Sequence, residues 1–288
     1  MSAPDAAVAG VAPATLIWAP GGTRRRATIE GVPLDERYIA WARGHLVENV
    51  ALFFRLGVQH LIVPILGPRQ MAEEGLYGER LIAWIGGALA GPLACAEYQQ
   101  RGWRARMIGQ ADSLPALTET AAQMAAATPD GAHTLWFYAV TDDDDPWREV
   151  LATAGRTGAR TQREAVRALY GEDVPPATLL IGFGKPVVGT TLLPPLLTAD
   201  DMQCYWTQRA GFRLTEPMLR TIIYDYAYAR RTWRPDRQGR YADAPGLAAL
   251  WEREDVLGVG TRLGGYWYPT PFPASRDDEP IRQRGHGC

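Results

Sequence analysis

Near its beginning the sequence reads Thr15-Leu16-Ile17-Trp18-Ala19-Pro20-Gly21-Gly22-Thr23-Arg24-Arg25-Arg26. The apolar residues 15–18 predict a strand, and the glycines allow a tight turn in which the backbone comes close to a ligand. Guanidinium forks match phosphate oxygens, so we predict a diphosphate-binding loop at the carboxyl end of this strand, where α/β folds hold their ligands. Its members are Gly21, Gly22, Thr23, Arg24, Arg25 and Arg26. The alternative is a solvated basic loop.

The composition is that of an ordinary globular protein. Of 288 residues, 47% are hydrophobic and 22% are charged, with a net charge of −2. We therefore expect no nucleic-acid partner, and any affinity for anions must be local. Cys95, Cys204 and Cys288 are too few and too widely spaced for a disulfide framework or a metal motif. The first residues lack the charged region of a signal peptide, and the longest apolar run, 81–96, is shorter than a membrane span. We expect a cytoplasmic protein without a transmembrane segment.

Strand and helix patterns alternate along the chain. Apolar runs predict further strands at 60–66, 103–108, 134–140, 178–184 and 203–207. Helical spacing and capping residues predict helices at 35–56, 113–127, 161–170 and 214–231, with a glycine-punctuated helical region up to about residue 100 and a hairpin within 256–268. This alternation predicts an α/β fold with a mostly parallel central sheet flanked by helices.

The domain boundaries follow from composition. Residues 1–13 are rich in Ala, Pro and Gly and are predicted to be disordered, as is the tail 271–288. Residues 14–270 are predicted to form a single domain, because no composition shift or linker divides them before about residue 232.

Short motifs occur in order between residues 15 and 268. They are Gly22-Thr23-Arg24-Arg25, Val63-Pro64-Ile65, Tyr170-Gly171-Glu172, Ile181-Gly182-Phe183-Gly184, Leu214-Thr215-Glu216, Ile223-Tyr224-Asp225 and Gly265-Tyr266-Trp267. Together they resemble the cis-prenyltransferase fold of undecaprenyl diphosphate synthases, and more closely its tuberculosinol synthase (tuberculosinyl transferase) branch. The resemblance implies a homodimeric enzyme that ionises an allylic diphosphate. In that branch the substrate is a bicyclic C20 diphosphate made by a class II cyclase, and water or another nucleophile captures the cation.

The resemblance also assigns residues by position. Arg24 and Arg25 match diphosphate-binding arginines, Tyr38 and Tyr77 match catalytic tyrosines, and Lys185 stands where the family has a basic residue. A solvated loop lysine and a packed tyrosine are the alternatives for Lys185 and Tyr38.

One position departs from the family motif. The motif begins with an aspartate that holds Mg²⁺, and this chain has Gly21 there, while Arg26 replaces an aromatic residue. Mg²⁺ is therefore a possible cofactor whose family ligand is missing. The competing hypotheses are a non-catalytic binding or regulatory subunit of a prenyltransferase and an unrelated nucleotide-binding α/β protein.

The cation left by ionisation needs a dry, aromatic surrounding, because the faces of aromatic rings stabilise cations. Trp41 and Trp84 are predicted to line this hydrophobic pocket, with Trp18, Tyr38 and Tyr77 as further candidates; the alternative for each is an ordinary place in the core. The small residues in 85–91 would either line an apolar tunnel or allow close helix packing.

Four consecutive aspartates, 142–145, precede Pro146. Class I terpene cyclases hold magnesium on aspartate-rich motifs, which favours a metal site. An acidic residue before a proline is also an ordinary helix start, so both interpretations stay open.

Overall fold

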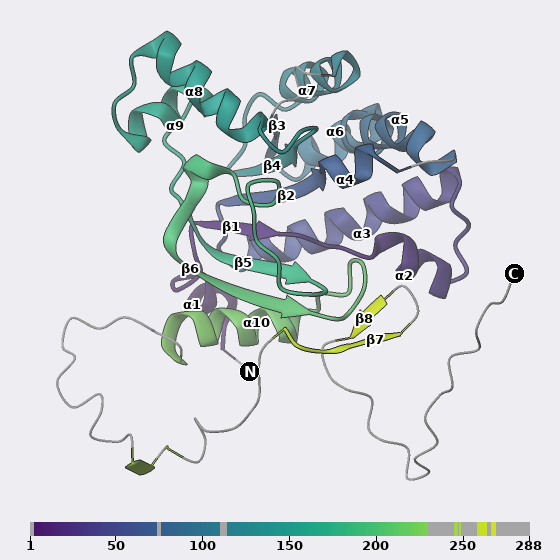
Figure 1. Cartoon of the computed structure of the whole chain (residues 1–288), viewed down its shortest axis with the longest axis vertical. Helices are drawn as coiled ribbons and strands as arrows, with labels where there is room; N and C mark the ends of the chain where they lie inside the picture. Colours follow the sequence, from purple (N-terminus) through teal and green to yellow (C-terminus); the bar gives the residue numbers. More distant parts are fainter. Residues whose placement is uncertain are drawn as a thin grey trace, which may run out of the picture.

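A central parallel sheet organises the chain in the computed structural model, which describes residues 3–73, 76–109, 114–229, 245–246, 248, 258–263 and 266–268. Its strands lie in the order β3-β4-β2-β1-β5-β6 (Figure 1). Their bounds are β1 Thr15–Trp18, β2 His60–Leu66, β3 Trp103–Ile108, β4 His133–Ala139, β5 Ala177–Phe183 and β6 Thr198–Thr207. Every pairing among them is parallel, so the predicted α/β architecture is confirmed.

Helices cover the sheet and link its strands (Figure 1). Their bounds are α1 Asp5–Ala9, α2 Thr23–Ile29, α3 Glu36–Arg55, α4 Pro68–Met71, α5 Leu76–Ala90, α6 Pro92–Gln100, α7 Pro115–Ala127, α8 Asp145–Thr157, α9 Gln162–Tyr170 and α10 Glu216–Tyr224, with a π-helical turn at Asp225–Ala229. Strands β7 (Thr261–Leu263) and β8 (Tyr266–Tyr268) pair antiparallel, which confirms the predicted hairpin.

The core divides between the two faces of the sheet. Leu16 and Trp18 of β1 pack on one face with α3 and α5, and Ile17 between them packs on the other with Val166 of α9. Alternating side chains point to opposite faces of a strand, and both faces here are covered, so a central parallel strand is apolar throughout.

Capping residues set the helix ends that the sequence predicted. The Asp35 carboxylate accepts the backbone N–H of Arg37 at 2.9 Å and caps α3. Thr161 and Glu164 form a reciprocal capping box at the start of α9. Gly57, at φ 100°, adopts the left-handed conformation just after α3 ends.

Two local predictions were wrong. The arginines follow the glycine turn on helix α2 rather than in a loop. The residue that caps the helix is Gly22, which offers no capping side chain, so the usual start signal is absent. Part of the N-terminus expected to be disordered is helical: α1 buries Val8 in the core, and Asp5 forms ion pairs with Arg55 and Arg220. The tail 271–288 lies outside the described residues.

The aspartate run starts helix α8. Asp145 is buried, and its carboxylate accepts the Thr141 hydroxyl at 2.6 Å and the Asp142 N–H at 2.9 Å. Within the described part of the chain, no group of three or more His, Cys, Asp or Glu side chains could hold a metal. The helix-start interpretation therefore accounts for this run.

One helical stretch, Arg80–Gln100, has the length and composition of a membrane span. The core helix of a soluble domain passes the same test, and here Leu81, Ile85 and Leu89 pack into the core. The expected absence of a transmembrane segment stays a prediction.

Candidate active site

The turn after β1 passes tightly against β5. Gly21 and Gly22 connect β1 to α2, and Gly22 has a φ of 74°, which favours glycine. The Gly21 carbonyl accepts the Gly211 N–H at 2.8 Å. A Cβ atom at residue 21 would lie only 2.6 Å from Cδ1 of Phe183, the last residue of β5. The turn therefore needs glycine at position 21 while Phe183 holds this place.

The three arginines of α2 have different surroundings. The Arg24 guanidinium donates to both oxygens of Glu73, at 2.8 and 2.6 Å. The Arg25 guanidinium carbon lies 5.6 Å from the centre of the Phe183 ring. Arg26 forms an ion pair with Glu30, the residue that follows the end of α2. All three arginines thus lie on one short helix, which begins just after the carboxyl end of β1.

A pair of hydroxyl groups lies next to these arginines. Thr23 Oγ1 and the Tyr38 hydroxyl are 2.7 Å apart, and Tyr38 is buried at the start of α3. Burial raises the pKa of the Tyr38 phenol, while the Thr23 hydrogen bond and the nearby Arg24 charge act in the opposite direction. The phenol therefore stays protonated at neutral pH and can donate a hydrogen bond.

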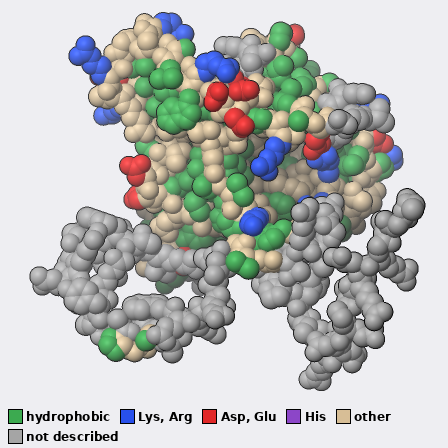
Figure 2. Space-filling view, viewed as in Figure 1, with side chains coloured by type: hydrophobic (Ala, Val, Ile, Leu, Met, Phe, Trp, Pro, Cys, Tyr) green, Lys and Arg blue, Asp and Glu red, His purple; other side chains and the backbone are tan. Residues whose placement is uncertain are grey.

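A cavity of about 190 Å³ opens beside this hydroxyl pair, between α3 and α5. Most of its wall is apolar, from α3, the end of β2 and α5, and its polar contributions come from Thr23, Tyr38, Arg43 and Gln70. In Figure 2, basic and acidic side chains gather around a hollow over the region where Figure 1 places α2 and α4. The arginine-bearing helix and the apolar cavity thus share one residue, Thr23.

The two predicted pocket tryptophans have different positions. Trp84 lies in the cavity wall. Trp41 stacks on Tyr38 with 6.0 Å between ring centres, and its Nε1 donates to Glu30 at 2.8 Å. Trp41 therefore supports Tyr38 from behind, and Phe212, which precedes α10, supplies another ring to the wall.

In the run 85–91 at the end of α5, mainly the larger side chains border the cavity, whereas a glycine makes the close contact with a neighbouring helix. Ile85, Ala88 and Leu89 line the cavity. Gly86 faces α7, where an added Cβ would lie 3.2 Å from the Thr120 hydroxyl oxygen. One side of α5 therefore borders the cavity, and another packs closely on its neighbour.

The two remaining predicted site residues, Lys185 and Tyr77, have no described contact with the cavity. Lys185 is exposed beyond β5, and its Nζ lies 5.7 Å from the centre of the Trp267 ring in β8. It is at the same edge of the sheet as the arginines, because β1 and β5 are parallel neighbours. Tyr77 belongs to helix α5, but its side chain lies outside the described residues.

The residues around Gly21 do not fit the magnesium site of the cis-prenyltransferase motif. Phe183 fills the space of a side chain at position 21, and the nearby Glu73 and Glu30 are both paired with arginines. Mg²⁺ requires oxygen ligands in near-octahedral geometry. The described residues supply no carboxylate at the position where the family motif has its aspartate.

Sequence reasoning missed Glu73, Gln70 and Phe212, and it quoted Phe183 only as part of a motif. The pairing of neighbouring strands could have pointed to Phe183, because β1 and β5 end at the same edge. No local signal marks Glu73, which is 49 residues from Arg24.

The chain is similar in sequence to two proteins of known name. The chain is 38% identical to (+)-kolavelool synthase of Herpetosiphon aurantiacus over 273 residues, which cover 93% of each protein. It is 34% identical over 113 residues to tuberculosinyl adenosine transferase of Mycobacterium tuberculosis, covering 38% of this chain and 37% of that protein. No protein-family model matches the chain.

Solved structures support the fold. Lavandulyl diphosphate synthase from Lavandula x intermedia, in complex with dimethylallyl diphosphate, superposes with a TM-score of 0.61 at 16% identity, covering 77% of this chain and 98% of that one. A probable undecaprenyl diphosphate synthase from Campylobacter jejuni gives a TM-score of 0.56 at 15% identity, covering 76% and 97%. This chain therefore belongs to the cis-prenyltransferase-fold family, in the branch of (+)-kolavelool synthase and tuberculosinyl adenosine transferase, and is a diterpene synthase-like enzyme.

Proposed function

We propose that this enzyme ionises a bicyclic C20 allylic diphosphate and that water captures the resulting cation to give a diterpene alcohol. The observation that carries the proposal is the junction at Thr23, where the arginine-bearing helix α2 meets an apolar cavity with aromatic walls. The 38% sequence identity to (+)-kolavelool synthase, over 93% of the chain, supports a diterpene-forming substrate. Another nucleophile in place of water would give a related product.

Ionisation separates two charges, and the two parts of the site suit one each. The allylic C–O bond breaks with both electrons leaving on the diphosphate. Arg24 and Arg25 would stabilise this growing negative charge, and removing one preorganised donor at such a site costs about 3 kcal/mol. The rings of Tyr38, Trp84 and Phe212 would face the allylic cation, each contributing about 1–2 kcal/mol where water is excluded.

The hydroxyl pair is suited to place the nucleophile. A water molecule adds through its oxygen to the cation and then loses a proton. The protonated Tyr38 phenol, held by Thr23, can orient this water, and the released diphosphate is the final acceptor of the proton.

We further propose that α2 arginines, rather than a metal held at position 21, provide the charge stabilisation on the protein side. The close approach of Phe183 to Gly21 supports this proposal. A homodimer and a cytoplasmic location stay predictions.

The test is an incubation of the purified chain with bicyclic C20, bicyclic C15 and linear C20 diphosphates, with Mg²⁺ and with EDTA. We expect pyrophosphate and an alcohol from the bicyclic C20 substrate, with turnover retained in EDTA. Failure to turn over any substrate under either condition would contradict the proposed reaction.

Tyr38→Phe tests the role of the phenol. We expect kcat to fall about tenfold, the effect of losing one hydrogen bond of about 1.4 kcal/mol. We also expect the ratio of alcohol to hydrocarbon products to fall. The control is Tyr224→Phe, which alters a half-exposed tyrosine on α10. An unchanged product ratio in Tyr38→Phe would show that the Tyr38 phenol does not orient the attacking water.

A further inference from the structure

The bond between Arg24 and Glu73 has the geometry of a phosphate contact. Two parallel N–H···O bonds, at 2.8 and 2.6 Å, join the two Nη atoms of Arg24 to the two carboxylate oxygens. A guanidinium holds two oxygens of a phosphate group through the same fork. The carboxylate of Glu73 therefore occupies the end of Arg24 that an incoming diphosphate would take.

Glu73 differs from the other carboxylate paired with an α2 arginine. Glu30 is four residues after Arg26 in the sequence, and its carboxylate also accepts the Trp41 Nε1 hydrogen at 2.8 Å. Glu73 comes from a separate segment, just after α4. The two carboxylates are almost equally exposed, at 30% and 29%, but the Arg24 side chain is 41% exposed and that of Arg26 only 17%. A partly exposed ion pair between separate segments contributes little to stability, so a ligand of higher charge can replace it.

The segment that carries Glu73 also borders the cavity. Gln70, three residues earlier on α4, lies in the cavity wall, as does Thr23, the residue before Arg24. The Arg24–Glu73 pair therefore bridges the two segments that adjoin the diphosphate end of the cavity.

We infer that Glu73 is a displaceable counter-ion that competes with the diphosphate for Arg24 and thereby sets the affinity for substrate and for released pyrophosphate. This inference rests on the proposed function. In the free enzyme the carboxylate neutralises Arg24. Binding of a diphosphate exchanges one bidentate partner for another, and the pair forms again when pyrophosphate leaves.

Titration calorimetry of the full chain with inorganic pyrophosphate tests this competition. We expect Glu73→Gln to bind pyrophosphate about fivefold more tightly than the wild type, the factor that corresponds to a partly exposed ion pair. The matched control is Glu36→Gln, which removes an exposed carboxylate from the start of α3 without touching Arg24. That variant should change the dissociation constant less than twofold, and thermal unfolding checks that each variant is folded.

A second background separates competition from a general charge effect. Arg24→Lys keeps the positive charge but removes the fork. In this background, adding Glu73→Gln should change pyrophosphate binding by less than twofold. Equal tightening in both backgrounds, or none in the wild-type background, would overturn the inference.

The same titrations distinguish this inference from the diphosphate site itself. If Arg24→Ala abolishes pyrophosphate binding while Glu73→Gln matches the wild type, the site stands and the competition fails. If Arg24→Ala binds pyrophosphate as well as the wild type, or if no variant binds it, the diphosphate site fails and the inference fails with it.

Discussion

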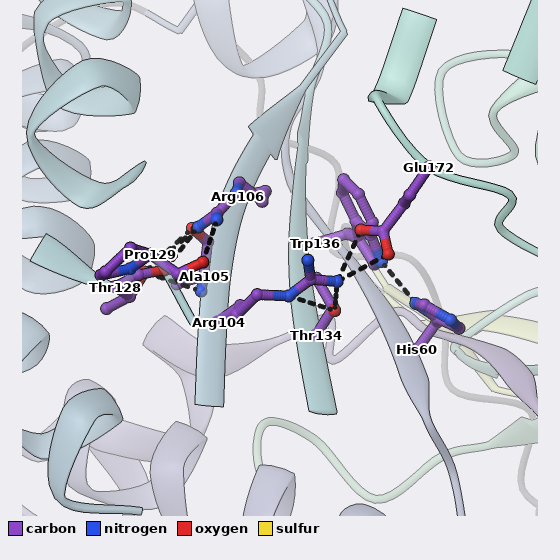
Figure 3. Close-up of polar contacts among 9 residues, drawn as sticks. All are labelled: His60, Arg104, Ala105, Arg106, Thr128, Pro129, Thr134, Trp136 and Glu172. Carbon is purple, nitrogen blue, oxygen red and sulfur yellow. Dashed lines mark hydrogen bonds and ion pairs between the residues drawn. The ribbon is translucent and has the colours of Figure 1, made fainter. Parts of the chain in front are cut away.

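Two arginine–glutamate pairs of this protein look alike but lie at opposite ends of the parallel strands, which we call the carboxyl edge and the amino edge of the sheet. At the carboxyl edge, Arg24 pairs with Glu73 beside the cavity. At the amino edge, Arg104 at the start of β3 donates to both oxygens of Glu172 at 2.6 and 2.7 Å, and also to the Thr134 hydroxyl at 2.6 Å (Figure 3). Arg106, on the same strand, donates to the carbonyls of Thr128 and Pro129 (Figure 3).

The difference lies in what surrounds each pair. The amino-edge arginines bond to strand and loop atoms that belong to the frame of the fold, and none of them lines the cavity between α3 and α5. The α2 arginines stand on a short helix next to that cavity. An ion pair therefore indicates a ligand site only where an opening adjoins it, and distance alone does not distinguish the two cases.

The largest expected effect is on catalysis at the carboxyl edge. We predict that Arg25→Ala lowers kcat/KM by about 10²- to 10³-fold, because one preorganised cation facing the leaving group is lost. Arg25 is exposed, so the free energy of unfolding should change by only about 0.5 kcal/mol or less. Steady-state kinetics and urea unfolding measure the two quantities, and near-normal turnover would place Arg25 outside the site.

A smaller effect, on stability, is expected at the amino edge. Arg104→Ala should lower the free energy of unfolding by about 1–2 kcal/mol, because the partly exposed Glu172 and the buried Thr134 hydroxyl both lose a charged partner. The kcat/KM value should stay within about threefold of the wild type. Arg101→Ala, which breaks the surface pair with Glu97 one turn earlier at the end of α6, is the control and should cost about 0.5 kcal/mol or less. If Arg104→Ala lost much activity without losing stability, the amino-edge pair would not be purely structural, and the contrast between the two edges would fail.

The smallest effect is a pH dependence of stability at the amino edge. Burial lowers the pKa of His60, with Arg104 and His133 acting in the same direction and Glu172 against them. The neutral ring accepts the Trp136 Nε1 hydrogen at Nδ1, at 3.3 Å (Figure 3).

The sign follows from proton linkage. Below the ordinary pKa of 6.5, the unfolded chain binds a proton at this histidine more readily than the folded protein does. The contribution of His60 to stability is therefore complete above pH 6.5 and is lost as the pH falls through the lowered folded value. Urea unfolding at several pH values should show a slope below pH 6.5 that His60→Gln reduces, and identical slopes would refute the assignment.

Much of the fold could be predicted because its signals are local. The apolar runs of β2 and β5, the Asp35 cap of α3 and the Thr161 cap of α9 act within a few residues of sequence. Helix α2 was missed because Gly22, in its left-handed conformation, replaces the usual capping side chain.

The amino-acid sequence by itself determined the parallel sheet, the place of Arg24 and Arg25 after β1, and the motif in which Gly21 stands for aspartate. Only the tertiary structure decided that Phe183 fills the space at Gly21, that Trp41 lies behind Tyr38, and that Glu73 pairs with Arg24. The physical reason is range. Periodicity and capping act between neighbours along the chain, whereas contacts between distant residues exist only after the strands and helices have packed.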